Sequence, residues 1–226
     1  MRLGQYPFRP TIGPYRSSLE RPINNHVQRR GRPRSEEADR AIRTATLRII
    51  ADLGIGALSI ERVAAEARVA KTTIYRRWNC KEDLIVDAIA SVDLPLPELP
   101  GTSIREDLII VAENLRWRHL ESAQGPLLAA LANESLRHPS LRERYAEIIV
   151  KPREAQVLEV LKRGIEIGEL RPDLDLELAT ITIFAPIMQI VRFYPHLRSP
   201  ETVERSVDML LRGMISVHSR RTEAYE

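Results

Sequence analysis

Residues 58–83, with the sequence LSIERVAAEARVAKTTIYRRWNCKED, constrain the fold more than any other part of the chain. Each half of this segment repeats apolar or small residues at helical spacing, namely Ile60, Val63, Ala64 and Ala67 in the first half and Val69, Thr73, Ile74 and Trp78 in the second. Two short helices joined by a tight turn at residues 67–70 can bury these side chains in one small core. Basic and hydroxyl side chains remain on the second helix, so the pattern predicts a helix-turn-helix unit that contacts DNA.

The sequence on either side of this unit predicts two further helices. Residues 35–54 begin with acidic side chains, which favour a helix N-terminus, and continue with an apolar stripe that ends at Gly54. Residues 81–92 carry a second apolar stripe, which stops at the proline-rich sequence DLPLPELPG. We therefore expect an N-terminal DNA-binding domain at residues 35–92, built on a three-helix helix-turn-helix fold.

Prolines mark the organisation of the rest of the chain. Three prolines within residues 93–102 deny helix continuation and predict a linker. Residues 103–219 show helical patterning throughout, so the predicted fold is all-α, with a second helical domain for effector binding and dimerisation; residues 220–226 form a tail. Pro152 lies inside a long helical pattern and is expected to kink or split that helix.

The N-terminal residues 1–34 differ in composition from the remainder. They contain eight arginines, five prolines and a single acidic residue, and their little apolar periodicity cannot bury enough surface to offset the entropy of ordering. This composition predicts a disordered basic arm, in which Arg32 and Arg34 of the sequence GRPR are candidates for the DNA minor groove. Because the whole chain carries a net charge of only +3, the remainder is mildly acidic, which argues against the whole body lying on nucleic acid or on an anionic membrane.

Several classes of protein are disfavoured by what the sequence lacks. The single cysteine, Cys80, excludes a disulfide within the chain and a cysteine-based zinc site, and it fits a reducing compartment. The five histidines form no HExxH motif or close pair, so we expect no metal and no cofactor. No grouped nucleophile, base and acid and no glycine-rich phosphate loop are visible, which argues against an enzyme. The chain start lacks the apolar stretch of a signal peptide, and no segment offers about 18 uncharged apolar residues, so we expect a cytoplasmic protein without a membrane contact.

The predicted DNA contacts surround the second helix of the helix-turn-helix unit. Side chains in the first turn of such a helix reach base edges and phosphates, and those of the next turn reach the backbone. A serine before the first helix caps it and can also touch a phosphate, and a lysine that opens the following helix can hold the flanking phosphate. Each of these residues taken alone is more often an ordinary surface residue, and only the joint pattern indicates DNA binding. The predicted contact residues are Arg32, Arg34, Ser59, Lys71, Thr72, Thr73, Tyr75, Arg76 and Lys81.

The last two predicted helices indicate self-association. In residues 176–194 apolar side chains cover nearly the whole helix circumference, which suits burial on two sides. Residues 200–216 keep a single apolar stripe. Together the two helices can pack against a twofold copy as a four-helix bundle, so they predict a homodimer interface, and a core wholly within one chain is the alternative.

The N-terminal domain resembles that of TetR-family transcriptional regulators. The resemblance covers about 60 residues and is carried above all by TTIYRRWNCKEDL, at residues 72–84. It implies a homodimeric, ligand-responsive repressor that binds an inverted-repeat DNA operator. Arg68 stands where the family usually has glycine and must tolerate the backbone that glycine permits, while Ala70 gives up the usual serine cap of the recognition helix. Asn79-Cys80 stands where the family commonly has proline or asparagine followed by serine, so Asn79 is expected to cap the helix that follows.

The effector of such a regulator would occupy the interior of the C-terminal helices. Large apolar and aromatic side chains there predict a small-molecule pocket, although such residues at helical spacing are more often plain core. The alternative function is therefore a ligand-independent DNA-binding architectural or adaptor protein. The predicted pocket residues are Trp117, Tyr145, Phe184, Met188 and Phe193.

Overall fold

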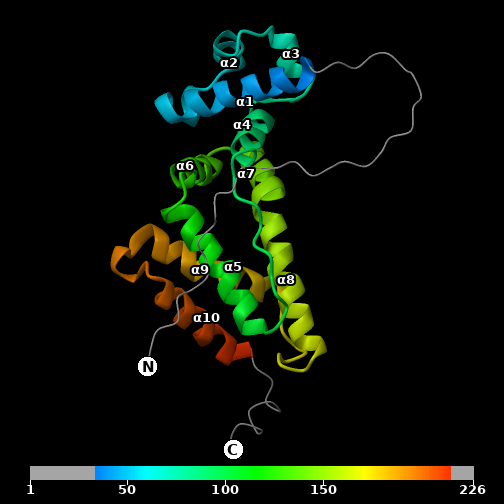
Figure 1. The fold of residues 1–226 in the computed structure, drawn as a ribbon, viewed down its shortest axis with the longest axis vertical. Helices are drawn as coiled ribbons and strands as arrows, with labels where there is room; N and C mark the ends of the chain where they lie inside the picture. Colours follow the sequence, from blue (N-terminus) through cyan, green and yellow to red (C-terminus); the bar gives the residue numbers. More distant parts are fainter. Residues whose placement is uncertain (1–33, 215–226) are drawn as a thin grey trace, which may run out of the picture. The chain divides into compact units, whose positions relative to one another are not determined.

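A computed structural model describes residues 34–214, and every regular element in this range is a helix (Figure 1). The all-α prediction is therefore confirmed. Residues 1–33 of the predicted arm, with Arg32, and residues 215–226, with the predicted tail, lie outside the described residues. Arg34 is the first residue of the first helix and not part of the preceding segment.

The N-terminal helices form the predicted helix-turn-helix unit. Their cores are built from the expected side chains, because Ile60, Val63, Ile74 and Trp78 are all buried. The first helix packs against the second and the fourth, and the second packs against the third. The elements are α1 (Arg34–Leu53), the 3-10 turn η1 (Ile55–Ala57), α2 (Ile60–Glu66), α3 (Lys71–Tyr75) and α4 (Lys81–Ala90).

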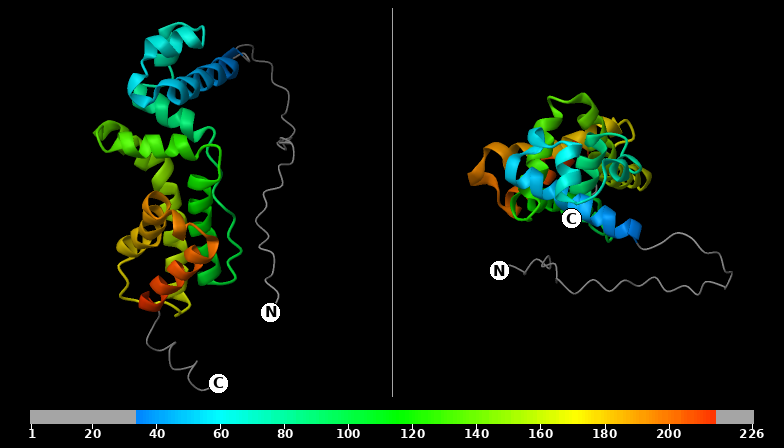
Figure 2. Two further views of the ribbon diagram at one scale, coloured as in Figure 1. Left: turned by 90° about the vertical axis from the view of Figure 1, so that its left-hand side faces the viewer. Right: turned by 90° about the horizontal axis from the view of Figure 1, so that it is seen from above.

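In the C-terminal part, α5 lies beside α8, α9 and α10 and packs against all three (Figure 2). These helices form where the sequence carries apolar stripes. Ser103 and Asp175 cap α5 and α9, because their side chains accept hydrogen bonds from backbone N–H groups. The elements are α5 (Ile104–Leu120), α6 (Gly125–Ser135), α7 (Pro139–Tyr145), η2 (Ala146–Val150), α8 (Lys151–Glu166), α9 (Leu176–Phe193), η3 (Pro195–Leu197) and α10 (Pro200–Met214).

Pro152 interrupts the long helical pattern as predicted. The segment is divided into α7 and α8 by the single π-helical turn η2, and Pro152 stands in the first turn of α8. A proline has no N–H to donate and its ring crowds the preceding turn, so the wider π turn accommodates it without ending the helix.

The predicted linker does not separate the two apolar cores of the protein. Residues 93–102 are indeed non-helical and separate α4 from α5. However, the first core combines side chains of α1–α4 with Leu128, Leu131, Leu141 and Ile149 from beyond the linker. The reason is that α4 packs against α6, α7 and η2, which a pattern of single helices does not reveal. A second core joins α5, α8, α9 and α10.

Helix α9 is apolar on more than one face. By length and composition alone, it is the one helix within residues 34–214 that could cross a membrane. On the sequence alone we expect no such segment. A core helix meets the same criterion, and α9 packs against α5, α8 and α10 with Ala179, Ile183 and Ile187 buried. On its other side Leu178 remains 60% exposed, as does Met209 of α10 at 73%.

Candidate nucleic-acid interface

The turn between α2 and α3 is closed by backbone hydrogen bonds around a left-handed residue. Arg68 has a φ of 55°, as its place in the usual glycine position predicts. The N–H of Val69 donates to the carbonyl of Ala64 at 3.0 Å, and the N–H of Arg68 donates to Ala65 at 3.2 Å. This pair of bonds is the Schellman arrangement that ends many helices, usually with glycine at the left-handed position. The turn therefore holds a non-glycine residue in the left-handed region, at a cost of about 1 kcal/mol in backbone strain.

Replacing Arg68 with glycine should raise the free energy of unfolding by about 1 kcal/mol, because glycine adopts this φ without strain. For a chain of this size the melting temperature should rise by about 2–4 °C. Thermal unfolding followed by circular dichroism measures the change. Arg62→Gly is the comparison variant, because within α2 the same substitution should cost about 1 kcal/mol and also removes the hydrogen bond from Arg62 Nη1 to the Ala57 carbonyl. A melting temperature that falls in both variants would contradict the strain at Arg68.

Helix α3 presents the predicted contact residues on its outer side. Lys71 and Thr72 are exposed, Thr73 is half-buried, and Tyr75 is 53% exposed. Arg76, immediately after the helix, is also exposed, whereas Ile74 points into the core. Ala70 precedes the helix without a side-chain cap, as its identity requires. One short surface therefore carries an ammonium, hydroxyls, a phenol and a guanidinium.

An ion pair joins the two helices of the unit at this surface. Lys71 Nζ donates to Glu61 Oε1 at 2.7 Å, with both side chains exposed. This hydrogen bond raises the pKa of Lys71 and lowers that of Glu61. The ammonium group has two further hydrogens, so Lys71 can donate to a phosphate while Glu61 orients its side chain.

Trp78 anchors the end of the recognition segment to α1 and α4. Its indole Nε1 donates to Asp87 Oδ2 at 3.0 Å, and Arg43 Nε donates to the same oxygen at 2.8 Å. The Arg43 guanidinium lies 5.9 Å from the centre of the Trp78 ring, within cation–π range. Arg77, whose direction the sequence left open, donates to Asp39 of α1. Asp39 and Asp87 therefore fix Arg77 and Trp78 to both neighbouring helices.

Of the two predicted side-chain caps, the cap of α2 is present and the cap of α4 is not. Ser59 caps α2 as expected, because its hydroxyl accepts a hydrogen bond from the Arg62 N–H at 3.2 Å. The prediction that Asn79 caps α4 is wrong. Cys80 holds the extended backbone of the N-cap position and makes no side-chain cap, so Asn79 lies one residue too early. Lys81 is the first residue of α4 and is half-buried.

A cavity of about 220 Å³ lies among α5, η2, α8 and α9. The structure places three predicted pocket residues, Tyr145, Phe184 and Met188, in its wall. Trp117 and Phe193 lie outside it: Trp117 is on a different face of α5 from the lining residues, and Phe193 ends α9 with 60% of its surface exposed. The lining residues are Leu115, Arg118, His119, Tyr145, Ile149, Val150, Arg153, Glu154, Ile181, Phe184, Ala185 and Met188.

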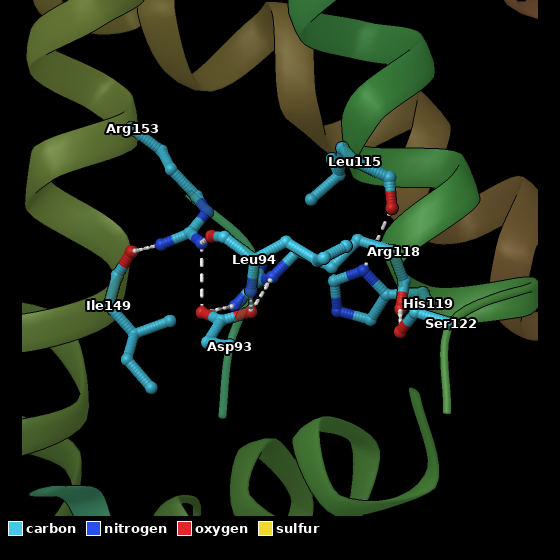
Figure 3. Close-up of polar contacts among 8 residues, drawn as sticks. All are labelled: Asp93, Leu94, Leu115, Arg118, His119, Ser122, Ile149 and Arg153. Carbon is cyan, nitrogen blue, oxygen red and sulfur yellow. Dashed lines mark hydrogen bonds and ion pairs between the residues drawn. The ribbon is translucent and has the colours of Figure 1, made fainter. Parts of the chain in front are cut away.

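The polar part of this wall was missed at the sequence level. Arg118 and Arg153 both bind the carboxylate of Asp93, which belongs to the linker after α4 (Figure 3). Arginines within a helical pattern look like surface charges, and only the tertiary arrangement brings Asp93 between them. The prolines of the linker predict a non-helical segment, but they do not predict that Asp93 within it is buried.

Two sequence families match the chain. The profile described as "Bacterial regulatory proteins, tetR family" matches residues 42–88, and the profile described as "Tetracyclin repressor-like, C-terminal domain" matches residues 100–210. The HTH-type transcriptional regulator YdeS of Bacillus subtilis (strain 168) is 35% identical over 162 residues, which cover 70% of this chain and 80% of YdeS.

Solved structures show the same fold at lower identity. The TetR family transcription regulator SCO0332 aligns with a TM-score of 0.60 at 23% identity, over 80% of this chain and all of that one. NalD of Pseudomonas aeruginosa, described as the secondary repressor of the MexAB-OprM multidrug efflux pump, aligns with a TM-score of 0.57 at 20% identity, over 81% of this chain and 99% of NalD. At these identities the two structures show the same fold as this chain.

Proposed function

Because the chain belongs to the TetR family of helix-turn-helix transcriptional regulators, we propose that it is a cytoplasmic repressor that binds an inverted-repeat operator as a homodimer and releases it when a small molecule occupies the cavity. The observation that supports the proposal is the exposed surface of α3, which carries the predicted contact residues. Buried Ile74 and Trp78, with the hydrogen bond from Trp78 to Asp87, hold this surface in place. The cavity favours a ligand-responsive regulator over a ligand-independent architectural protein.

The proposed DNA contacts divide into two groups. Lys71, Thr72 and Thr73 begin α3 and are the proposed base and phosphate contacts in the major groove. Tyr75 and Arg76 are the proposed backbone contacts of the next turn. Ser59 and Lys81 are proposed to contact flanking phosphates. Arg32, and Arg34 at the start of α1, are proposed to enter the minor groove.

The proposed dimer interface is formed by α9 and α10. Leu178, Ile181 and Met209 are 60%, 48% and 73% exposed, and large apolar side chains on neighbouring helices seldom face water together in a monomer. A twofold copy would cover both helices with the same surface, as isologous interfaces do. Ile181 also lines the cavity, so dimer contacts and ligand contacts would share a helix.

The proposed coupling between ligand and DNA passes through the first apolar core. Ile149 and Tyr145 line the cavity and also pack with the core that contains the α4 side chains. A ligand that moves η2 would therefore move α4, which opens with Lys81 and packs against α1. Ligand binding would then favour a dimer in which the two α3 helices no longer match the groove spacing of about 34 Å.

Selection of DNA from a random pool by the full chain should recover inverted repeats, because a twofold dimer presents two equivalent α3 helices. Sequencing of the recovered DNA gives the repeat and its spacing, and light scattering of the complex gives the number of chains bound. Recovery of single half-sites with one chain bound would contradict the proposed dimer. Recovery of no preferred sequence would contradict the operator-binding function.

A further inference from the structure

We propose that the cavity binds a compact organic anion whose carboxylate competes with Asp93 for Arg118 and Arg153. This inference names the class of ligand for the proposed function. Only the release of the operator by the ligand rests on that proposed function. The binding itself concerns this cavity alone.

The apolar part of the cavity limits the size of the ligand. Leu115, Ile181, Phe184 and Met188 contribute apolar side chains to a volume of about 220 Å³. This volume lies between that of an engineered cavity of about 150 Å³ that holds benzene and the roughly 300 Å³ at which pockets for drug-sized molecules begin. A single aromatic ring or a short branched alkyl chain fits this space.

The polar part of the cavity holds two cations against one carboxylate (Figure 3). Arg118 binds Asp93 through two hydrogen bonds of 2.6 Å, from Nε to Oδ1 and from Nη2 to Oδ2, and Arg153 Nη2 binds Oδ2 at 2.8 Å. The side chains of Arg118, Asp93 and Arg153 are only 2%, 7% and 13% exposed. Two buried guanidinium groups that share one carboxylate leave positive charge that solvent hardly screens, and a second carboxylate would neutralise it.

Unused hydrogen-bonding atoms lie in the same wall. Arg153 Nε and His119 Nε2 are buried and have no hydrogen-bond partner within residues 34–214. His119 Nδ1 must donate to the Leu115 carbonyl, 2.9 Å away, because a carbonyl oxygen only accepts. Burial lowers the pKa of His119, so its neutral ring offers Nε2 as an acceptor for a hydroxyl hydrogen of the ligand. Burial and then repulsion from Arg118 lower the pKa of Arg153, which an added anion would counteract.

The remaining charged lining residue is Glu154, which follows Arg153 on α8. It lies about 100° further around the helix than Arg153, away from the side of Arg153 that binds Asp93. Burial raises the pKa of Tyr145, and the nearby charges of Arg118 and Arg153 act against this rise. Tyr145 and His119 therefore mark the cationic end of the cavity, where the ligand carboxylate belongs.

Competition for the two arginines would reach the DNA-binding domain through the linker. Asp93 follows the end of α4 at Ala90 and also accepts the Leu94 N–H at 2.9 Å. A ligand carboxylate that takes the guanidinium donors would repel Asp93 and release this segment from α5 and α8. The end of α4 would then lose its fixed position, and with it the placement of Lys81 and α3.

Calorimetric titration of the full chain with phenylacetate and with its neutral analogue phenylacetamide tests the proposal. The wild type should bind the acid about tenfold more tightly than the amide, since charge-assisted hydrogen bonds have no equivalent in the amide. Asp93→Asn should tighten phenylacetate binding by about a further tenfold, because the arginines lose their competing carboxylate, and should leave phenylacetamide binding within about twofold. Arg153→Gln should abolish the preference for the acid. Asp173→Asn, which removes an exposed acid paired with Arg171 outside the cavity, is the matched control and should change neither affinity.

The proposal is overturned if Asp93→Asn shows no saturable binding of phenylacetate, or if it binds acid and amide equally. It is also overturned if Arg153→Gln keeps the wild-type preference for the acid. Circular dichroism checks that each variant is folded, and if Asp93→Asn does not fold, the comparison of Arg153→Gln with the wild type decides. Operator binding is measured separately on the unliganded chain. Its absence would contradict the proposed function and leave the anion site standing, whereas anion binding without operator release would contradict only the proposed link through the linker.

Discussion

Replacement of Lys71 by alanine together with Tyr75 by phenylalanine is expected to weaken binding to the selected operator about 100-fold, since two polar DNA contacts of about 1–3 kcal/mol each are lost. The dependence of affinity on salt should also become shallower, because one fewer phosphate charge is neutralised. Fluorescence anisotropy with labelled operator at several salt concentrations measures both changes. Lys71 and Tyr75 are exposed, so neither substitution disturbs the core.

The matched control for this variant is Glu61→Gln, which removes the ion-pair partner of Lys71 and keeps the lysine. Loss of a negative charge beside the DNA should leave affinity unchanged or increase it. Both variants lose the ion pair, but only the variant that lacks Lys71 should bind DNA more weakly. This difference separates a DNA contact of Lys71 from a contribution of the ion pair to stability. An unchanged affinity of the double variant at every salt concentration would show that α3 is not the reading helix.

Trp78→Ala is expected to lower the free energy of unfolding by about 4 kcal/mol, because it opens a cavity in the core and removes a hydrogen bond to Asp87. For a chain of this length the melting temperature should fall by about 10 °C. Chemical denaturation followed by circular dichroism measures the free energy directly.

The control for this prediction is the neighbouring aromatic residue. Tyr75→Ala should change the free energy of unfolding by no more than about 0.5 kcal/mol, because its ring is 53% exposed. The same variant should lose operator affinity. If the two substitutions lowered stability equally, the assignment of Trp78 to the core and Tyr75 to the DNA surface would be wrong.

The helix-turn-helix core was predictable because its information is local. Ile60, Val63, Ile74 and Trp78 repeat at the spacing of one helix face, and only a tight turn brings the two faces together. The left-handed conformation of Arg68 was predictable from its position in a known pattern. The cap of α4 was not, since a shift of one residue, from Asn79 to Cys80, changes which side chain stands at the N-cap.

The cavity was only partly predictable because it depends on contacts between distant segments. Phe184 and Met188 were found as large apolar residues on an apolar helix. Arg118 and Arg153 were missed, since their burial depends on Asp93, which lies 25 and 60 residues away in the sequence. Phe193 was assigned to the pocket from its residue type, but the end of α9 leaves it exposed.

The first apolar core has a consequence for the construction of hybrid regulators. Exchange of N-terminal domains between related proteins assumes that the DNA-reading part is a portable module cut at the linker. Here α4 shares its core with Leu128, Leu131 and Leu141, so a cut at residues 93–102 would expose apolar side chains on both fragments. A transplanted reading domain would need α6 and α7 to be transplanted or redesigned with it. In this protein the portable unit is thus defined by the shared packing and not by the proline-rich joint.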